Sequence, residues 1–295
     1  MKSFSCQSYG KWILAGDHSV LRGVPALVFP LKSRRLELTF QEGSQSLDLI
    51  LKGEHGADLQ KLVWGVIDRA CEMKGFSRSV LTGVLELESS IPVGAGMGAS
   101  AALCVALTSW LGHLGYVPKS DYYEFARQLE NLFHGESSGV DIAVALSGEG
   151  LRFVRNGERS FLKADWSPRW YISYTGKRGV TMEAVNKVKS LIAKNPTVGE
   201  RIDKEMAEAV SEAANALSLP EAQGLSILAK AINLAGGCFE QWGLNEGAPA
   251  AHLQWLRENG AMAVKPTGSG GGGYVLSLWK HEPSAEVLSQ LIPCS

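Results

Sequence analysis

Long apolar runs are missing from this sequence. No stretch approaches the roughly 18 apolar residues of a membrane-spanning helix, and the first residues, MKSFSCQSYGKW, lack the apolar segment of a secretory signal. The net charge is also close to zero, because the chain has 29 Lys and Arg residues and 30 Asp and Glu residues. Basic clusters such as KSRR at 32–35 are short. We therefore expect a cytoplasmic protein that binds neither nucleic acid nor a membrane.

Cysteine patterns typical of disulfide frameworks and zinc sites are also absent. The chain forms no CxxC pair, and no histidine cluster lies beside a cysteine. We expect the five cysteines to be reduced thiols and a structural zinc ion to be absent. They are Cys6, Cys71, Cys104, Cys238 and Cys294.

The stretch IPVGAGMGASAALCVAL at 91–107 places three glycines and a serine before an apolar helix. Glycine lets a backbone approach a ligand closely, and a helix N-terminus attracts anions, so the pattern fits a phosphate group. It is not a Walker loop, because Ala99 rather than a lysine precedes Ser100. Gly94, Gly96 and Ala99 satisfy the loose dinucleotide pattern, but the acidic residue that should follow a second strand is missing.

Two further loops share this character. HGESSGVD at 134–141 leads into a short apolar helix, and KPTGSGGGG at 265–273 contains four consecutive glycines. A run of glycines costs backbone entropy on folding, which favours a ligand that must lie against the backbone. Each loop alone is compatible with a tight turn. Together the three loops indicate a phosphate-bearing ligand.

The hydrophobic pattern predicts a mixed chain in two parts, with the boundary beside Pro168. In the first part we expect strands near the start and through 35–51, helices over 58–74, 98–112 and 121–133, a strand before the first glycine loop, and short strands near 151 and 160. In the second part we expect a strand at 170–175, helices over 180–194, 201–217, 222–241 and 249–259, and a strand after the last glycine loop.

Four motifs taken together resemble those of the GHMP kinases, and among them the mevalonate kinases most closely. In chain order they are GKWILAGDHSVL, PVGAGMGASAA, HGESSGVD and KPTGSGGGG, spread over nearly the whole chain. The resemblance implies an α+β fold of two lobes with ATP and acceptor bound between them. The N-terminal ATP-binding lobe, 1–167, would contain a left-handed β-α-β crossover, against the usual right-handed rule. The C-terminal lobe, 168–295, would be ferredoxin-like.

The resemblance assigns the first glycine loop to the phosphates of ATP. The loop backbone would cradle them, aided by the positive end of the following helix. Ser100 would also ligate Mg²⁺; family members commonly have two serines here, and Ala99 stands in place of one. The alternative role of Ser100 is a helix cap. The phosphate-binding candidates are Gly94, Gly96, Met97, Gly98, Ala99, Ser100 and Ala101.

Glu130 precedes Asp141 by eleven positions, the separation that mevalonate kinases have between the Mg²⁺ carboxylate and the catalytic aspartate. The resemblance makes Glu130 a Mg²⁺ ligand and Asp141 the group that orients or deprotonates the acceptor hydroxyl. Lys11 matches the lysine that pairs with this aspartate and would stabilise its negative charge. Taken alone, Glu130 also fits an exposed helical glutamate, and Asp141 fits an acid stabilised by a helix N-terminus.

The resemblance also assigns the acceptor-binding residues. Asp17 and His18 match the GEH of mevalonate kinases, with Asp in place of Glu, and Thr181 matches a threonine near the acceptor. Lys177 and Arg178 are candidates for an acceptor carboxylate, because a small anion needs a cation. Their alternative is a solvated charged loop. The last glycine loop adds Gly268 and Gly270.

These assignments predict an ATP- and Mg²⁺-dependent kinase that phosphorylates the primary hydroxyl of mevalonate or a close analogue, a step of isoprenoid biosynthesis. One alternative is another GHMP kinase acting on phosphomevalonate, homoserine or a sugar or polyol. A second is a non-catalytic ligand-binding protein on the same fold. A dinucleotide-dependent oxidoreductase is disfavoured by the missing ribose-binding acid. A homodimer is a possible assembly.

Overall fold

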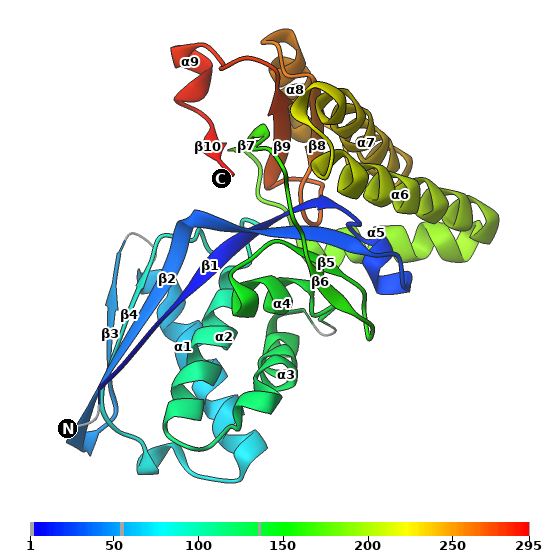
Figure 1. Ribbon diagram of the computed structural model, residues 1–295. Coiled ribbons are helices and arrows are strands. Elements are labelled where there is room, and N and C mark those ends of the chain that lie inside the picture. The colour runs from blue at the N-terminus through cyan, green and yellow to red at the C-terminus, as the bar shows by residue number, and fades with distance from the viewer. Residues whose placement is uncertain (1–2, 54–55, 135–136, 295) are drawn as a thin grey trace. The chain divides into compact units, whose positions relative to one another are not determined.

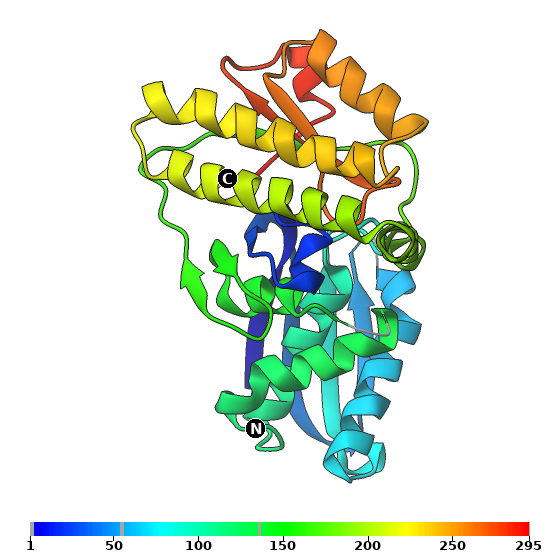
Figure 2. The same ribbon diagram turned by 90° about the vertical axis from the view of Figure 1, so that its right-hand side faces the viewer.

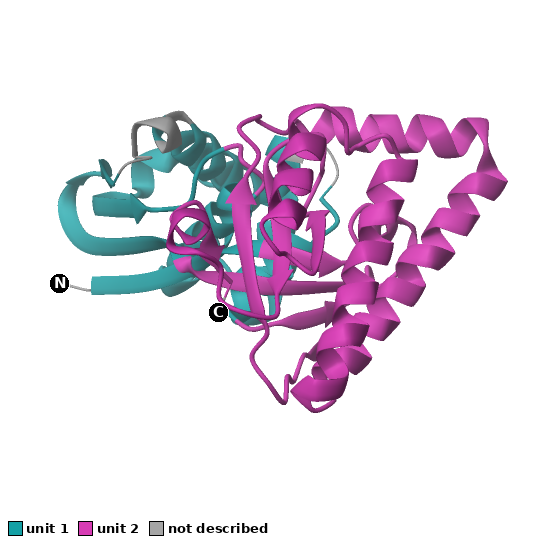
Figure 3. Ribbon diagram, turned by 90° about the horizontal axis from the view of Figure 1, so that it is seen from above, with its two compact units in different colours: residues 1–11, 34–93, 97–148 teal, residues 12–33, 94–96, 149–295 magenta. Residues whose placement is uncertain are grey.

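The computed structural model describes residues 3–53, 56–134 and 137–294. Two compact units can be distinguished, and Figure 3 colours them separately. Unit 1 comprises residues 1–11, 34–93 and 97–148, and unit 2 comprises residues 12–33, 94–96 and 149–295. Both units contain helices and strands, so the expected α+β class is confirmed. The domain boundary at 167/168 stays a prediction.

The larger sheet has six strands, with the path β3-β4-β2-β5-β6 and β1 paired to β2. Its long strand β2 (Ala26–Ser46) pairs antiparallel with β4 (Thr82–Ser89) and with β5 (Leu151–Phe153). In β2, Leu36, Leu38 and Phe40 are buried while the residues between them are not, the period of two expected of a strand with one core face. The remaining strands are β1 (Ser3–Ala15), β3 (Asp48–Lys52) and β6 (Arg159–Phe161).

In unit 1, β3 and β4 are parallel neighbours joined by α1 (Gly56–Lys74). Parallel neighbouring strands need such a crossover, and α1 packs on both of them (Figure 1). The helices α2 (Ala99–His113), α3 (Tyr122–His134) and α4 (Val140–Ser147) pack on one another. The β3-α1-β4 segment is the β-α-β unit that the resemblance implies. The left-handed sense of its crossover stays a prediction.

In unit 2, an antiparallel sheet has the order β10-β7-β9-β8. Its central strand β9 (Tyr274–Trp279) is buried throughout, as its apolar sequence predicts. The others are β7 (Arg169–Tyr174), β8 (Ala263–Pro266) and β10 (Ile292–Pro293). A four-stranded antiparallel sheet with covering helices agrees with the ferredoxin-like lobe that was expected.

The long helices α6 (Pro196–Leu217) and α7 (Glu221–Gln241) of unit 2 run side by side, and α7 also packs on β8 (Figure 2). Helix α6 begins five residues before the predicted start, because Pro196 is well tolerated in the first helical turn. The other helices are α5 (Thr181–Lys194), α8 (Ala248–Glu258) and α9 (Ala285–Leu288). The short 3-10 helices among the described residues are η1 (Ser19–Arg22), η2 (Arg78–Val80) and η3 (Lys119–Asp121).

Over the ranges that the structure describes, no helix combines the length and the apolarity needed to cross a bilayer.

Candidate active site

The first glycine loop ends at Gly98, the N-cap residue of α2. Gly98 has φ +77°, and a Cβ placed on it would lie 2.8 Å from Lys11 Cγ, closer than carbon atoms pack. The main-chain N–H of Lys11 donates to the carbonyl oxygen of Met97 at 2.9 Å. Glycine at position 98 therefore lets Lys11 lie directly against the start of α2.

The first turn of α2 is the predicted phosphate cradle. Its first intrahelical hydrogen bond runs from Ala102 N to Gly98 O, at 2.9 Å. The amides of Ala99, Ser100 and Ala101 precede this bond, so they belong to the electropositive first turn of the helix. Ala99 and Ala101 are buried and Ser100 is half-buried. The local backbone therefore suits an anion.

Lys11 pairs with Asp141 within unit 1. Lys11 Nζ lies 3.2 Å from Asp141 Oδ2, and the two side chains are 6% and 22% exposed. Asp141 is the second residue of α4, whose N-cap is Gly139. The positive end of this helix and the lysine charge both stabilise the carboxylate. The structure thus brings together the two residues predicted to act as a pair.

Glu130 lies on α3 and is buried. Ser137 Oγ donates to Glu130 Oε2 and accepts from Gly139 N at 3.0 Å, while Ser137 N donates to Asn131 Oδ1 at 2.8 Å. Helix α3 thereby holds the segment that leads into α4. Ser137 was not among the predicted site residues, and its place within HGESSGVD was its only signal in the sequence. Residues 135–136 of that motif lie outside the described residues.

The charge state of Glu130 depends on its surroundings. Burial raises the pKa of its carboxyl to about 8, and the negative charge of Asp141 acts in the same direction. The hydrogen bond from Ser137 and the positive charges of Lys11 and Arg127 lower the pKa. A divalent cation at this carboxylate would likewise favour its charged form.

The oxygen donors of unit 1 fit Mg²⁺. Glu130 offers a carboxylate and Ser100 a hydroxyl, both hard ligands that this ion prefers. In the described part of the chain, no three His, Cys, Asp or Glu side chains gather into a metal-binding group. Mg²⁺ commonly binds through one or two carboxylates together with substrate phosphates. The donor set therefore suits an ion carried by ATP rather than one caged by the protein.

The middle of the glycine loop, 94–96, belongs to unit 2. A Cβ on Gly94 would lie 2.2 Å from Arg178 Nη2, so the guanidinium group lies directly against this glycine. Beside Gly96, no atom of the described residues, its chain neighbours apart, lies within 4 Å of such a Cβ. Lys177 is exposed, and its carbonyl accepts from Gly273 N at 2.7 Å. Of these two cations, Arg178 is the one seen against the phosphate loop.

Asp17 forms a buried ion pair with Lys265. Asp17 Oδ2 lies 2.9 Å from Lys265 Nζ with neither side chain exposed, and Asp17 Oδ1 accepts from Gly268 N at 2.8 Å. Lys265 Nζ also donates to Ile13 O at 3.1 Å and lies 5.1 Å from the centre of the Phe239 ring. Asp17 therefore anchors the last glycine loop, and its role in acceptor binding stays a prediction.

His18 has φ +52°, unusual for a residue other than glycine. Its Nε2 donates to Ser269 O at 2.8 Å, and its ring packs edge-on against Trp242 and Phe239. Burial lowers the pKa of His18, while the bond to Ser269 and the charge of Asp17 oppose that shift. A neutral ring that donates through Nε2 keeps Nδ1 as an acceptor. His18 therefore suits a ligand hydroxyl better than a carboxylate.

The remaining predicted acceptor residues also belong to unit 2. Gly268 is fixed by Asp17, and Gly270 packs on Phe239, since a Cβ there would lie 2.8 Å from that ring. The Gly268 amide is thus engaged by Asp17, and glycine at position 270 has a packing reason that involves no ligand. Thr181 is half-buried at the first position of α5.

Comparisons with known proteins identify the family of this chain. The family model described as GHMP kinases N terminal domain matches residues 61–149. The mevalonate kinase of Archaeoglobus fulgidus is 30% identical over 277 residues, covering 92% of this chain and 91% of that protein. This chain belongs to the mevalonate kinase family. The mevalonate kinase of Aeropyrum pernix is 29% identical over 306 residues, covering 97% of this chain and 91% of that protein.

A solved structure of this family shares the fold. The crystal structure of L. major mevalonate kinase in complex with R-mevalonate matches with a TM-score of 0.77 at 22% identity, covering 95% of this chain and 88% of that chain. The expected family and fold are therefore confirmed. For this member of the mevalonate kinase family, the roles of individual site residues rest on the geometry described above.

Proposed function

We propose that this chain is an ATP-dependent kinase that transfers the γ-phosphoryl group of ATP to the primary hydroxyl of mevalonate, in isoprenoid precursor synthesis. The observation that carries the proposal is the Lys11–Asp141 pair, 3.2 Å apart beside Gly98 at the start of α2. A carboxylate with its cation at a phosphate cradle is the arrangement that phosphoryl transfer to an alcohol requires. Membership of the mevalonate kinase family supports mevalonate as the acceptor.

Asp141 acts on the acceptor hydroxyl. The hydroxyl oxygen forms a bond to the γ-phosphorus, the bond from that phosphorus to the β,γ-bridging oxygen breaks, and ADP leaves. The hydroxyl proton passes to Asp141. Lys11 stabilises the negative charge of Asp141 and orients it through their contact. Positioning and electrostatics thus account for the catalysis.

Glu130 and Ser100 are the residues that would hold Mg²⁺. When bound, this ion offsets the charge of the β- and γ-phosphates. Ser137 orients the Glu130 carboxylate through its hydrogen bond and keeps the following segment in place. The first turn of α2 supplies backbone N–H groups for the phosphates.

We assign acceptor binding to side chains of unit 2. His18 offers Nδ1 to an acceptor hydroxyl, because burial favours the neutral form of its ring. Arg178 supplies the cation for the acceptor carboxylate, since a guanidinium group can bind a carboxylate through two hydrogen bonds. Thr181 is a candidate for a further hydroxyl contact. Asp17 supports this group from behind, through Gly268.

An ADP-release assay tests the proposal. With Mg·ATP, we expect mevalonate to be turned over faster than phosphomevalonate, homoserine, galactose or inositol at matched concentrations. Asp141→Asn serves as the blank for ATP hydrolysis without transfer. Faster turnover of another acceptor would overturn the choice of mevalonate and leave the kinase reaction standing. ATP binding without ADP release for any acceptor would instead favour a non-catalytic binding protein.

A further inference from the structure

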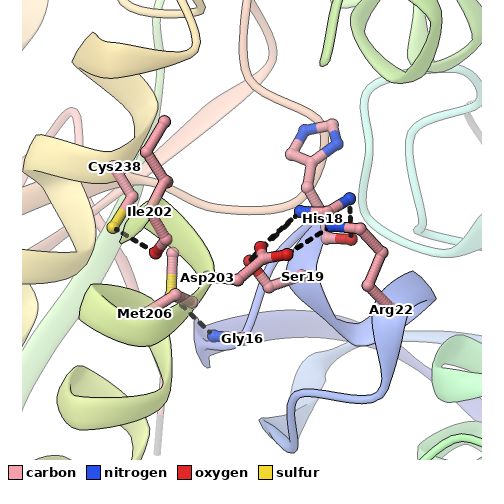
Figure 4. A network of polar contacts seen from close by, with 8 residues as sticks. All are labelled: Gly16, His18, Ser19, Arg22, Ile202, Asp203, Met206 and Cys238. Carbon is pink, nitrogen blue, oxygen red and sulfur yellow. Dashed lines mark hydrogen bonds and ion pairs between the residues drawn. The ribbon is translucent and has the colours of Figure 1, made fainter. Parts of the chain in front are cut away.

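The backbone of His18 needs support from the surrounding structure. Its φ of +52° and ψ of −46° lie outside the regions that residues with a Cβ favour. Such conformations persist only where neighbouring groups hold them. The ring of His18 is held by Ser269 and two aromatic side chains, as described above. The backbone is supported from another part of unit 2, helix α6 (Figure 4).

Asp203 of α6 binds the turn that follows His18. Its Oδ1 accepts from Ser19 Oγ at 2.6 Å and from Arg22 Nη2 at 2.5 Å, and its Oδ2 accepts from Arg22 Nε at 2.5 Å. A carboxylate that binds guanidinium through two hydrogen bonds makes a strong, directional pair. The side chains of Arg22 and Asp203 are 26% and 19% exposed, so water screens them only in part.

Arg22 connects this pair to His18. Arg22 Nη1 donates to His18 O at 3.3 Å, and Leu21 N donates to the same oxygen at 3.2 Å. The carbonyl group of His18 is therefore fixed by two donors, one of which Asp203 holds in place. Since a carbonyl that is fixed in direction restricts ψ of its own residue, this contact bears on the strained conformation itself.

Helix α6 also contacts the chain before His18. Met206 lies one turn after Asp203 on the same face of the helix, and its sulfur accepts a hydrogen bond from Gly16 N at 3.1 Å. The helix thus binds the GDHSVLR segment on both sides of His18 (Figure 4). The pairing joins positions 181 residues apart, and no sequence motif marks Asp203.

We propose that Asp203 and Arg22 form a clamp by which α6 holds His18 in the conformation needed to bind the acceptor. The proposal rests on the proposed function, in which His18 contacts the acceptor. Both residues are positioning residues that act through His18. Without the clamp, the His18 backbone can relax towards a favoured region, and its ring then leaves the orientation that the acceptor needs. Mevalonate binding should weaken, whereas binding of ATP should not.

Steady-state kinetics of four variants test the clamp. Asp203→Asn and Arg22→Gln should each raise the KM for mevalonate by about tenfold, with the KM for ATP changed by less than about twofold. The double variant should be no worse than either single one, because the two residues act as one unit. Glu208→Gln is the matched control, because it removes one exposed carboxylate from the same helix. Additive effects, or an unchanged KM for mevalonate in folded Asp203→Asn, would refute the clamp.

A second readout does not depend on turnover. In protein with isotope-labelled histidine, the imidazole NMR signal of His18 is identified by its loss in His18→Gln. We expect this signal to shift in Asp203→Asn and Arg22→Gln and to stay in place in Glu208→Gln. An unshifted signal in folded Asp203→Asn would also refute the clamp. If the parent does not phosphorylate mevalonate, the proposed function fails while the histidine signal still decides whether the clamp exists.

Discussion

Gly98→Ala would place a methyl group against the lysine of the candidate catalytic pair. The new Cβ would lie 2.8 Å from Lys11 Cγ and 3.5 Å from Lys11 Cε. Carbon atoms pack best at about 3.5–4.0 Å, so one of the two groups must move by about 1 Å. Lys11 is buried, and its main chain is bonded to Met97, so little space is available for that movement.

Two effects follow, of different size. A Cβ at φ +77° costs about 1–2 kcal/mol of stability, which lowers the unfolding temperature by a few degrees. Movement of Lys11 by about 1 Å disturbs its 3.2 Å contact with Asp141, and misplacement on this scale lowers rates by about 100-fold. We therefore expect a loss of kcat far larger than the loss of stability would suggest.

Gly115→Ala is the matched control. Gly115 follows the other end of α2 and has φ +86°. Within the described part of the chain, only its chain neighbours have atoms within 4 Å of a Cβ placed there. It carries the same backbone cost without touching Lys11. Thermal unfolding and steady-state kcat should be measured for both variants at saturating substrates. If both lose equal stability and both keep the parent kcat, the contact between Gly98 and Lys11 has no catalytic consequence and our reasoning is wrong.

Three further predictions concern other parts of the molecule. Asp141→Asn should lower kcat by about two to four orders of magnitude, the usual effect of losing a general base. Its ATP affinity, measured in a binding titration, should stay near the parent value, and near-normal turnover would contradict the role of Asp141. Ser137→Ala should raise the Mg²⁺ concentration for half-maximal rate several-fold, because Glu130 loses its hydrogen-bond donor. Ser137→Thr should keep the parent Mg²⁺ requirement. If the Mg²⁺ titrations of Ser137→Ala and the parent overlap, Ser137 has a structural role only. Burial lowers the pKa of His18, so the unfolded state still binds a proton at pH values where the folded state has lost it. His18 therefore makes the free energy of unfolding rise with pH up to its ordinary pKa of about 6.5, by at most about 1.4 kcal/mol per pH unit. Urea unfolding between pH 5 and 8 should show a shallower rise in His18→Gln and the parental rise in the exposed control His281→Gln, and identical slopes in all three proteins would exclude this contribution.

Much of the secondary structure follows from the sequence, because hydrophobic period and glycine or proline punctuation act over a few neighbouring residues. Helices α2 and α5 lie within about a turn of their predicted ranges, and β9 follows the last glycine loop as expected. Strand β8 (Ala263–Pro266) was missed, because four residues with a lysine and a proline show no strand period. Its place in the sheet depends on pairing with β9, which no local pattern reveals.

The candidate site divides in the same way. The motifs alone predicted site roles for Lys11, Asp141 and Glu130, because residue type and spacing can be read directly from the sequence. The tertiary structure decided which of these groups are buried and which neighbours they contact. Ser137 became a partner of Glu130 only when α3 and the following segment folded together.

Asp17 shows the limit of the motif most clearly. The motif predicts an acceptor-binding acid at this position, and the fold adds a pairing with Lys265, a lysine with no exposed surface. Lysine is rarely buried completely, so composition gives no reason to expect this pair. The clamp between Arg22 and Asp203 likewise depends on α6 lying beside η1. The sequence determines which charges and donors the chain carries, and the tertiary structure decides which of them meet, because their energies depend on distance and on exclusion of water.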